Sequence, residues 1–270
     1  MPRRPSEADS GKEMGTFMLL HLCAWPEVED RLQRSTGIIV PIGSTEQHGP
    51  NGLVGTDALC AEVVGQGVGE ALDALVAPTI SVGMAQHHLG FAGSITLRPS
   101  TLMAVVRDTV QSLSRHGFDR IFFVNGHGGN IATVSAAFSE VYADRSLHGP
   151  TEGSGRNSRA LRCHLKNWFD GPAIKALSEE LYGDAEGSHA TPSEVSLTQY
   201  AFPDAIKRAA LTPEIAPKGP IYDSEDYRGR FPDGRIGSNP ALASPEAGKR
   251  IYDTAVEEVA AEYRRFLDAE

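Results

Sequence analysis

Short apolar runs alternate along the chain with longer segments in which apolar residues recur every three or four positions. The runs are typical of buried strands, and the periodic segments are typical of amphipathic helices. The predicted strands are 37–43, 76–85, the first half of 119–130, and 159–169. The predicted helices are 26–34, 56–75, 100–117, 131–145, 172–183, 191–203 and 244–270. This alternation predicts an α/β fold in which a mostly parallel sheet carries helices on both faces.

The ends of this pattern set the predicted domain boundaries. Residues 1–15 hold charged side chains but no apolar run, which predicts a flexible N-terminal tail without a secretory signal. Residues 16–270 are predicted to form a single domain. Within it, 148–158 is predicted to be an exposed loop, and 203–244 is predicted to be an irregular excursion because it is rich in Pro, Gly and Asp.

Composition excludes several classes of protein. The chain has 270 residues, 40% of them hydrophobic and 22% charged, and a formal net charge of -10. The absence of a basic cluster argues against a nucleic-acid partner, and no apolar stretch approaches the length of a membrane span. The cysteines Cys23, Cys60 and Cys163 lack C-x-x-C spacing, which indicates free thiols in a reducing compartment. We therefore expect a cytoplasmic globular protein.

Two polar clusters follow predicted strands at their carboxyl ends, where α/β sheets form their sites. In GSTEQHGPNGLVGTD, Glu46 and His48 are two positions apart, so both side chains point the same way in an extended segment. Asp57 ends this cluster, and His127 lies in NGHGGN, the second one. Carboxylates and imidazoles together suit zinc, manganese or iron(II). The sequence thus predicts a site for one ion, or for two ions bridged by a carboxylate.

Each candidate also has a purely structural interpretation. Asp57 is suited to cap the helix that begins there, and NGHGGN is compatible with a tight turn or a phosphate-binding loop. A third polar stretch, EGSHATPSEVSLT, offers Glu186, His189 and Glu194 as further ligands. Its segment TPSE matches a capping box, in which the Glu194 carboxylate reaches back to a backbone amide. The residues alone leave these alternatives open.

Six segments, in order along the chain, resemble motifs of the creatininase (creatinine amidohydrolase) family. WPEVEDRL resembles the entry helix, IGSTEQHGPNGLVGTD the G-S-x-E-Q-H-G…D segment, and HHLGFAGSITL the H-x-x-F-x-G-[TS]-I-x-L stretch. VNGHGGN matches the N-G-H-G-G-N turn, SHATPSEVSLT is similar to the H-A-G-x-x-E-T-S segment, and GRIGSNPALASPEAG is similar to the last glycine-rich element. The resemblance runs from Trp25 to Gly248.

The resemblance implies a three-layer α/β/α fold and a hydrolase with two divalent metal ions, which are Zn, Mn or Fe. By position in the motifs, Glu46 and His127 are expected to bind one ion and His48 the other. Asp57 is expected to bridge the two ions, and Glu194 is expected to be the fifth ligand. The family commonly forms hexamers, which implies a homo-oligomer.

The implied reaction is hydrolysis of a C–N bond, other than a peptide bond, through a metal-bridging hydroxide. The implied substrate is a small cyclic amide, a formamide or a related compound. His189 corresponds to the pocket histidine that moves a proton to or from the reacting group, and His87 or His88 is expected to line the pocket. Members that hydrolyse creatinine resemble N-G-H-Y-E-N at the turn, where this chain has Gly128 and Gly129. This departure argues against creatinine as the substrate.

Two other functions are compatible with the sequence. The same metal site would serve hydrolysis of an ester or another non-amide substrate. Alternatively, the polar clusters are caps and turns in a non-catalytic ligand-binding α/β protein. Metal content separates an enzyme from a binding protein, and a substrate panel separates the two kinds of hydrolase.

Overall fold

The computed structural model describes residues 18–148 and 160–269. Five parallel strands form one sheet in the order β1-β3-β2-β4-β5. They are β1 (Met18–Leu19), β2 (Gly37–Ile42), β3 (Leu75–Val76), β4 (Arg120–Asn125) and β5 (Arg162–Asn167). The predicted tail at 1–15 and all but the first residue of the predicted loop at 148–158 lie outside the described residues.

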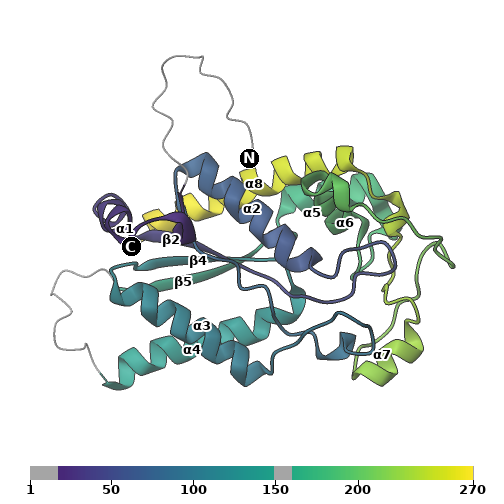
Figure 1. Ribbon diagram of the computed structural model, residues 1–270, viewed down its shortest axis with the longest axis horizontal. Helices are drawn as coiled ribbons and strands as arrows, with labels where there is room; N and C mark the ends of the chain where they lie inside the picture. Colours follow the sequence, from purple (N-terminus) through teal and green to yellow (C-terminus); the bar gives the residue numbers. More distant parts are fainter. Residues whose placement is uncertain (1–17, 149–159, 270) are drawn as a thin grey trace, which may run out of the picture.

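Helices cover both faces of the sheet, which confirms the three-layer α/β/α architecture. They are α1 (Trp25–Leu32), α2 (Thr56–Leu72), α3 (Pro99–Arg115), α4 (Ile131–His148), α5 (Pro172–Tyr182), α6 (Pro192–Ala201), α7 (Ser224–Arg230) and α8 (Pro245–Asp268). In Figure 1, α2, α5, α6 and α8 lie above the sheet, and α3 and α4 lie below it.

The apolar residues of the central strands divide between two cores, because alternate side chains of a strand point to opposite faces. Ile38, Val40 and Ile42 of β2 belong to the core under α3 and α4, whereas Ile39 belongs to the core under α2 and α8. Strand β4 divides its apolar residues in the same way. Both strands are buried along their whole length, which explains their unbroken apolar runs.

The predicted strand at 76–85 is wrong for most of its length. Strand β3 holds only Leu75–Val76, and within 77–85 the chain makes one isolated bridge, between Ile42 and Ile80. The Ala77 N–H still donates to the Ile39 carbonyl, but the next donor to β2 is the Ile80 N–H, three residues later rather than two, so regular pairing is lost between them. The remaining residues form a loop that passes the carboxyl end of the sheet and brings the Met84 carbonyl to His127.

The excursion at 203–244 is irregular as predicted, except for helix α7. This helix is short and mostly polar, so it gives no clear helical period. Its start is capped by the Asp223 carboxylate, which accepts hydrogen bonds from the backbone N–H groups of Glu225 and Asp226. Tyr227 and Phe231 are buried in a small apolar cluster that covers one side of the site.

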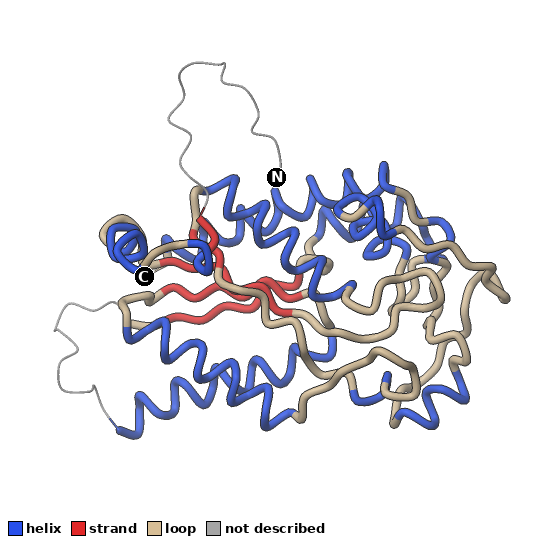
Figure 2. Tube along the Cα trace, in the orientation of Figure 1, coloured by secondary structure: helices blue, strands red, loops and turns tan. Residues whose placement is uncertain are grey.

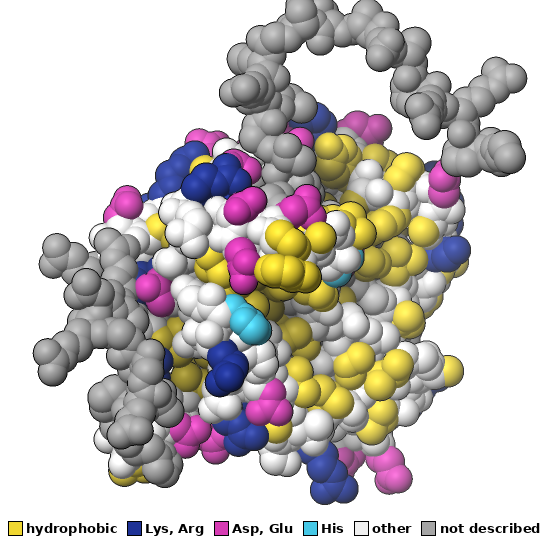
Figure 3. All heavy atoms as spheres, turned by 60° about the vertical axis from the view of Figure 1, so that its left-hand side comes forward, with side chains coloured by type: hydrophobic (Ala, Val, Ile, Leu, Met, Phe, Trp, Pro, Cys, Tyr) yellow, Lys and Arg dark blue, Asp and Glu magenta, His cyan; other side chains and the backbone are white. Residues whose placement is uncertain are grey.

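The outer surface carries charges of both signs. On the face in Figure 3, acidic and basic side chains lie intermixed, with hydrophobic side chains between them. Among the described residues, no helix combines the length and apolar character that crossing a membrane requires. Cys23, Cys60 and Cys163 are all free thiols, as their spacing indicates.

Candidate metal centre

The candidate site lies at the carboxyl ends of β2 and β4, where a long loop follows β2 and a short turn follows β4 (Figure 2). The loop after β2 carries Glu46 and His48, and the first turn of α2 carries Asp57. His127 follows β4 within two residues, and Glu194 lies in the first turn of α6. All five side chains predicted as ligands therefore come to one edge of the sheet, as expected for parallel strands.

Asp57 lies between two imidazole rings. Its Oδ1 atom is 3.1 Å from His48 Nε2, and its Oδ2 atom is 3.0 Å from His127 Nδ1. The interpretation of Asp57 as the helix cap is wrong, because Gly55 occupies the N-cap position. The Asp57 carboxylate turns toward the imidazoles, and the neighbouring Thr56 hydroxyl donates to the Leu53 carbonyl. One carboxylate is thus placed to contact two ions.

Two groups of side chains are compact enough to hold a metal ion each. Ligand atoms of Glu46, Asp57 and His127 lie within 4.8 Å of one another, and so do those of His48, Asp57 and Glu194. Asp57 belongs to both groups. This arrangement has the geometry of a two-ion site with one shared carboxylate.

The hydrogen bonds of both histidines fix which ring nitrogen faces Asp57. His48 Nδ1 lies 3.0 Å from the backbone carbonyl of Glu46, and His127 Nε2 lies 2.7 Å from that of Met84. Because a carbonyl only accepts, each of these nitrogens carries the hydrogen of a neutral ring. In the neutral rings that metal binding requires, His48 Nε2 and His127 Nδ1 would be the nitrogens with free lone pairs, the orientation that a metal-ligating histidine needs.

The site contains buried ionisable side chains that a cation between them would stabilise. Burial opposes protonation of both rings, but the carboxylates, Asp57 foremost, raise the pKa of His48 to about 10 and that of His127 to about 9. Burial and the nearby Asp57 raise the pKa of Glu46 to about 7. The buried atoms Glu46 Oε1 and Asp57 Oδ2 have no hydrogen-bond partner among the described residues. Divalent ions would satisfy these atoms, so the donor set fits a metal centre.

Glu194 forms the predicted capping box and also faces the site. The Thr191 hydroxyl accepts a hydrogen bond from the Glu194 backbone N–H, and the Glu194 carboxylate accepts one from the Thr191 backbone N–H. The same carboxylate lies 3.7 Å from His48 Nε2. Glu186, the other acidic candidate of this stretch, instead accepts a hydrogen bond from Ser193 and joins neither group.

His189 lies beside the candidate ligands, and the structure adds partners that the sequence analysis did not assign. His189 Nδ1 is 3.7 Å from Glu46 Oε1, and His88 Nε2 is 3.0 Å from the same oxygen. Glu46, His88 and His189 form a third compact group. Gln47 contacts both rings through its side-chain amide. The position of Gln47 between the candidate ligands Glu46 and His48 is the sequence signal that could have identified it.

The glycines of NGHGGN differ in how much space surrounds them. A Cβ atom at Gly128 would meet nothing within 4 Å, whereas one at Gly129 would come within 2.4 Å of His127 Nε2. Asn130 ends the turn and anchors it to two other backbone segments, because its amide donates to the Gly43 carbonyl and accepts from the Met84 N–H. The turn therefore positions His127 and leaves open space beside it.

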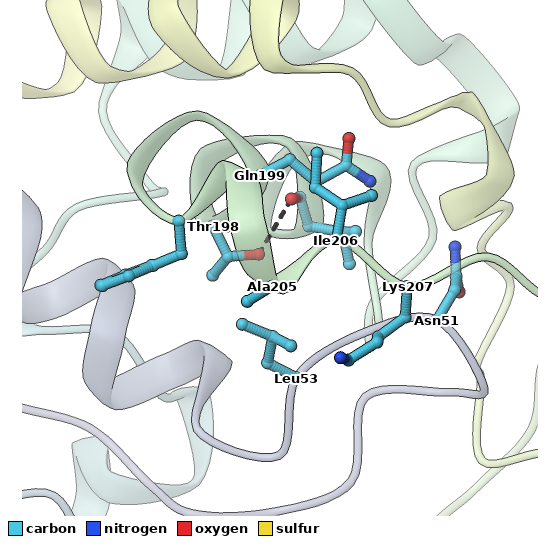
Figure 4. A pocket seen from close by; sticks show the side chains of 9 residues that line it. Asn51, Leu53, Thr198, Gln199, Ala205, Ile206 and Lys207 are labelled. Atoms are coloured by element: carbon cyan, nitrogen blue, oxygen red, sulfur yellow. Dashed lines mark hydrogen bonds between the residues drawn. The ribbon is translucent and has the colours of Figure 1, made fainter.

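A separate pocket lies between the loop after β2 and helix α6 (Figure 4). Leu53 and Ile206 give it an apolar wall, and Gln199 and Lys207 add polar groups. The Thr198 hydroxyl donates to the Val195 carbonyl rather than to the pocket. None of the six residues predicted for the site lines this pocket.

Comparisons with known proteins agree on one family. The family model described as Creatininase: Creatinine amidohydrolase matches residues 21–263. The mycofactocin precursor peptide peptidase of Mycolicibacterium smegmatis is 28% identical over 238 residues, or 85% of each chain. The creatinine amidohydrolase of Pseudomonas putida is 25% identical over 247 residues, which are 87% of this chain and 92% of that protein. A solved structure named "Creatininase Mn" has a TM-score of 0.79 at 24% identity and covers 93% of this chain and 99% of its own.

Proposed function

The chain belongs to the creatininase family, and from this membership we propose that it is a metal-dependent amidohydrolase. Its proposed reaction is hydrolysis of a C–N bond in a small cyclic amide, a formamide or a related compound. The observation that carries the proposal is the position of Asp57, whose two oxygens lie 3.1 Å and 3.0 Å from imidazole nitrogens of different histidines. A carboxylate in this position is suited to bridge two ions.

The proposed centre holds two divalent ions, which are Zn, Mn or Fe. Glu46 and His127 would hold one ion, His48 and Glu194 would hold the other, and Asp57 would contact both. Support comes from the backbone carbonyls bound to His48 Nδ1 and His127 Nε2, which leave the other ring nitrogen of each histidine toward Asp57, and from the manganese in the name of the similar solved structure. When bound, such ions lower the pKa of water toward neutrality and polarise a carbonyl group.

The chain's own residues supply proton transfer and space for the substrate. His189 lies at 3.7 Å from Glu46 Oε1 and is placed to take a proton from the attacking water and to deliver it to the leaving nitrogen. Positioned proton transfer of this kind typically contributes about 10²- to 10⁴-fold to the rate. The open space beside Gly128 leaves room for a substrate next to His127.

The test combines metal analysis with a substrate panel of creatinine, lactams, formamides, esters and short peptides. We expect about two equivalents of transition metal in the purified protein, by the two-ion geometry. Asp57→Ala is expected to lose metal and activity together, whereas His189→Ala is expected to keep the metal and lose turnover. Asp108→Ala, on the outside of α3, is the control, because its side chain is 69% exposed.

Each other outcome favours a different function. A protein without bound metal would favour the non-catalytic ligand-binding alternative. Turnover of esters alone would favour a metal hydrolase with a non-amide substrate. Metal that survives Asp57→Ala would reject the bridging role of this residue.

A second candidate function is cleavage of a short peptide. It is supported by the 28% identity with a peptide peptidase and by the open space at Gly128, where a larger substrate has room. The short peptides of the panel test it directly. Cleavage of peptides without turnover of lactams or formamides would favour this candidate over the first.

A further inference from the structure

We propose that His88 and His189 act as a donor and acceptor pair, in which His88 presents an N–H group and His189 a lone pair to the substrate. Gln47 is the positioning residue that fixes both rings. The catalytic part of this inference rests on the proposed hydrolase function, whereas the hydrogen positions follow from the contacts of Gln47 alone.

The orientation of the Gln47 amide is fixed by two backbone groups. Its Oε1 atom accepts a hydrogen bond of 2.8 Å from the Gly49 N–H, and its Nε2 atom donates one of 2.9 Å to the Gly234 carbonyl. If Oε1 and Nε2 were exchanged, the amide NH₂ would face the Gly49 N–H, and the amide oxygen would face the Gly234 carbonyl. Gln47 Nε2 therefore faces the two histidines, and it can only donate.

His88 receives the second hydrogen of this amide. His88 Nδ1 lies 2.9 Å from Gln47 Nε2, so it accepts, and the hydrogen of the neutral ring sits on Nε2. His88 Nε2 is 3.0 Å from Glu46 Oε1, yet that oxygen has no partner with hydrogen-bond geometry among the described residues. The His88 N–H group therefore lies beside Glu46 without a hydrogen bond to it, and in our proposal it serves the substrate.

His189 has its hydrogen on the side away from the site. His189 Nε2 lies 2.8 Å from the backbone carbonyl of Gln47, which only accepts, so Nε2 carries the hydrogen. Gln47 Nε2 also lies 2.9 Å from His189 Nε2, but we assign the two amide hydrogens to Gly234 and His88, because the Gln47 carbonyl requires a hydrogen on His189 Nε2. His189 Nδ1 is left with a lone pair that points toward Glu46 Oε1.

The two rings are held rigidly against each other. His88 and His189 stack with ring centroids 4.4 Å apart and planes inclined by 28°. Tyr227 packs its edge on His88, with the centroids 4.7 Å apart, and its hydroxyl donates to the same Gly234 carbonyl that holds Gln47. His88 is also 1% exposed, so the surrounding side chains hold its ring in place. The pair is thus preorganised, as transition-state stabilisation requires.

The division of roles gives a balanced hydrolysis. The oxygen of water bonds to the carbonyl carbon while His189 Nδ1 takes one of its protons. The His88 N–H group donates a hydrogen bond to the former carbonyl oxygen as negative charge develops there, without giving up its proton. The C–N bond then breaks, and His189 returns its proton to the leaving nitrogen. The assignment also excludes His88 as a ligand of a third ion, because its site-facing nitrogen bears hydrogen.

The first test reads the hydrogen positions without any turnover. Nitrogen-15 NMR of the zinc-loaded protein, labelled at histidine, reports which ring nitrogen is protonated, and variants at each position assign the signals. We expect the Nε2–H tautomer for both His88 and His189. The Nδ1–H tautomer at either residue would overturn the inference, whether or not the protein is an amidohydrolase.

The second test compares variants on the substrate found by the panel. His88→Gln keeps a donor near the Nε2 position and is expected to retain kcat within about tenfold, whereas His88→Leu is expected to lose about 10²- to 10³-fold with KM and zinc content unchanged. Equal losses in both variants, or one equivalent less zinc in His88→Gln, would contradict the assignment.

Gln47→Met tests the positioning role, because it removes the donor and keeps the volume. We expect the His88 signal to change to a mixture of tautomers, while the exposed Gln111→Met control leaves it unchanged. A His88 tautomer that is unaltered in folded Gln47→Met would show that Gln47 does not set it, and the wild-type spectrum decides the hydrogen positions if that variant does not fold.

Discussion

The Glu194 carboxylate accepts a hydrogen bond of 2.6 Å from the Thr191 backbone N–H, through the same Oε1 atom that lies 3.7 Å from His48 Nε2. One oxygen therefore takes part in the capping box of α6 and also faces the candidate metal centre. The sequence offered these as competing interpretations of Glu194. The geometry permits both at once, because an ionised carboxylate oxygen has more than one lone pair to offer.

The two roles of Glu194 are separable by substitution. Glu194→Gln keeps an oxygen that accepts from Thr191 but loses the negative charge that would hold an ion. We expect the stability to change by less than about 1 kcal/mol, while one equivalent of metal and at least about 10²-fold in kcat are lost. Metal analysis and urea unfolding of the same sample measure both. Glu27→Gln is the control, because Glu27 caps α1 in the same way outside the site.

The neighbouring glycines of the turn are expected to respond oppositely to alanine. In Gly129→Ala, the Cβ atom would come within 2.4 Å of His127 Nε2 and 2.9 Å of the Met84 carbonyl, so His127 must move. We expect a loss of metal affinity of about 10- to 100-fold. Gly128→Ala has nothing within 4 Å and is expected to bind metal normally. Titration calorimetry of both metal-free proteins compares them, and equal affinities would show that this contact does not hold His127.

The Asn130 amide joins three backbone segments at the edge of the sheet. Its nitrogen donates to the Gly43 carbonyl at 2.9 Å, and its oxygen accepts from the Met84 N–H at 3.1 Å. Asn130→Asp keeps the shape but replaces the donor with an acceptor, and is expected to cost about 1–3 kcal/mol or more. Urea unfolding measures the loss, and a change below about 0.5 kcal/mol would indicate that the turn is held by other contacts.

Glu186 is expected to make stability depend on pH. Burial raises the pKa of this carboxyl to about 7 from 4.5, so its neutral form is favoured by folding. The stability that the Glu186 carboxyl contributes is fully present below its pKa in the unfolded chain, and this contribution is lost as the pH rises through 7. Between pH 5 and 8 we expect the free energy of unfolding of the metal-free wild type to fall about 1–3 kcal/mol further than that of Glu186→Gln. Exposed Glu180→Gln is the control, and parallel profiles for all three proteins would contradict the shift.

Much of the fold was predictable, because burial on both faces leaves unbroken apolar runs such as the one in β2. The predicted strand at 76–85 was wrong for most of its length, because strand pairing also depends on the neighbouring strand. The segment after Leu75–Val76 is apolar enough for a strand, but its hydrogen bonds to β2 lose their regular spacing between Ala77 and Ile80. Helix α7 was missed because it is short and polar, and its burial depends on Tyr227 and Phe231.

The site was predictable as a set of residues but not as a set of contacts. Spacing and resemblance pointed to Asp57, yet only the geometry shows that its two oxygens face different rings. His88 lay in no ligand pattern, because its partners Gln47 and Glu46 come from a distant loop. The roles of the five ligands, the expected hexamer and the cytoplasmic location stay predictions.

The candidate ligands come from four separate stretches of the chain. These are the ends of β2 and β4 and the starts of α2 and α6. An ion bound there would cross-link parts of the polypeptide that meet only when the native topology is complete. Any species that binds only the native form adds to its stability by mass action. The melting temperature should then track the free metal concentration, and a chelator would weaken the fold as well as stop the reaction.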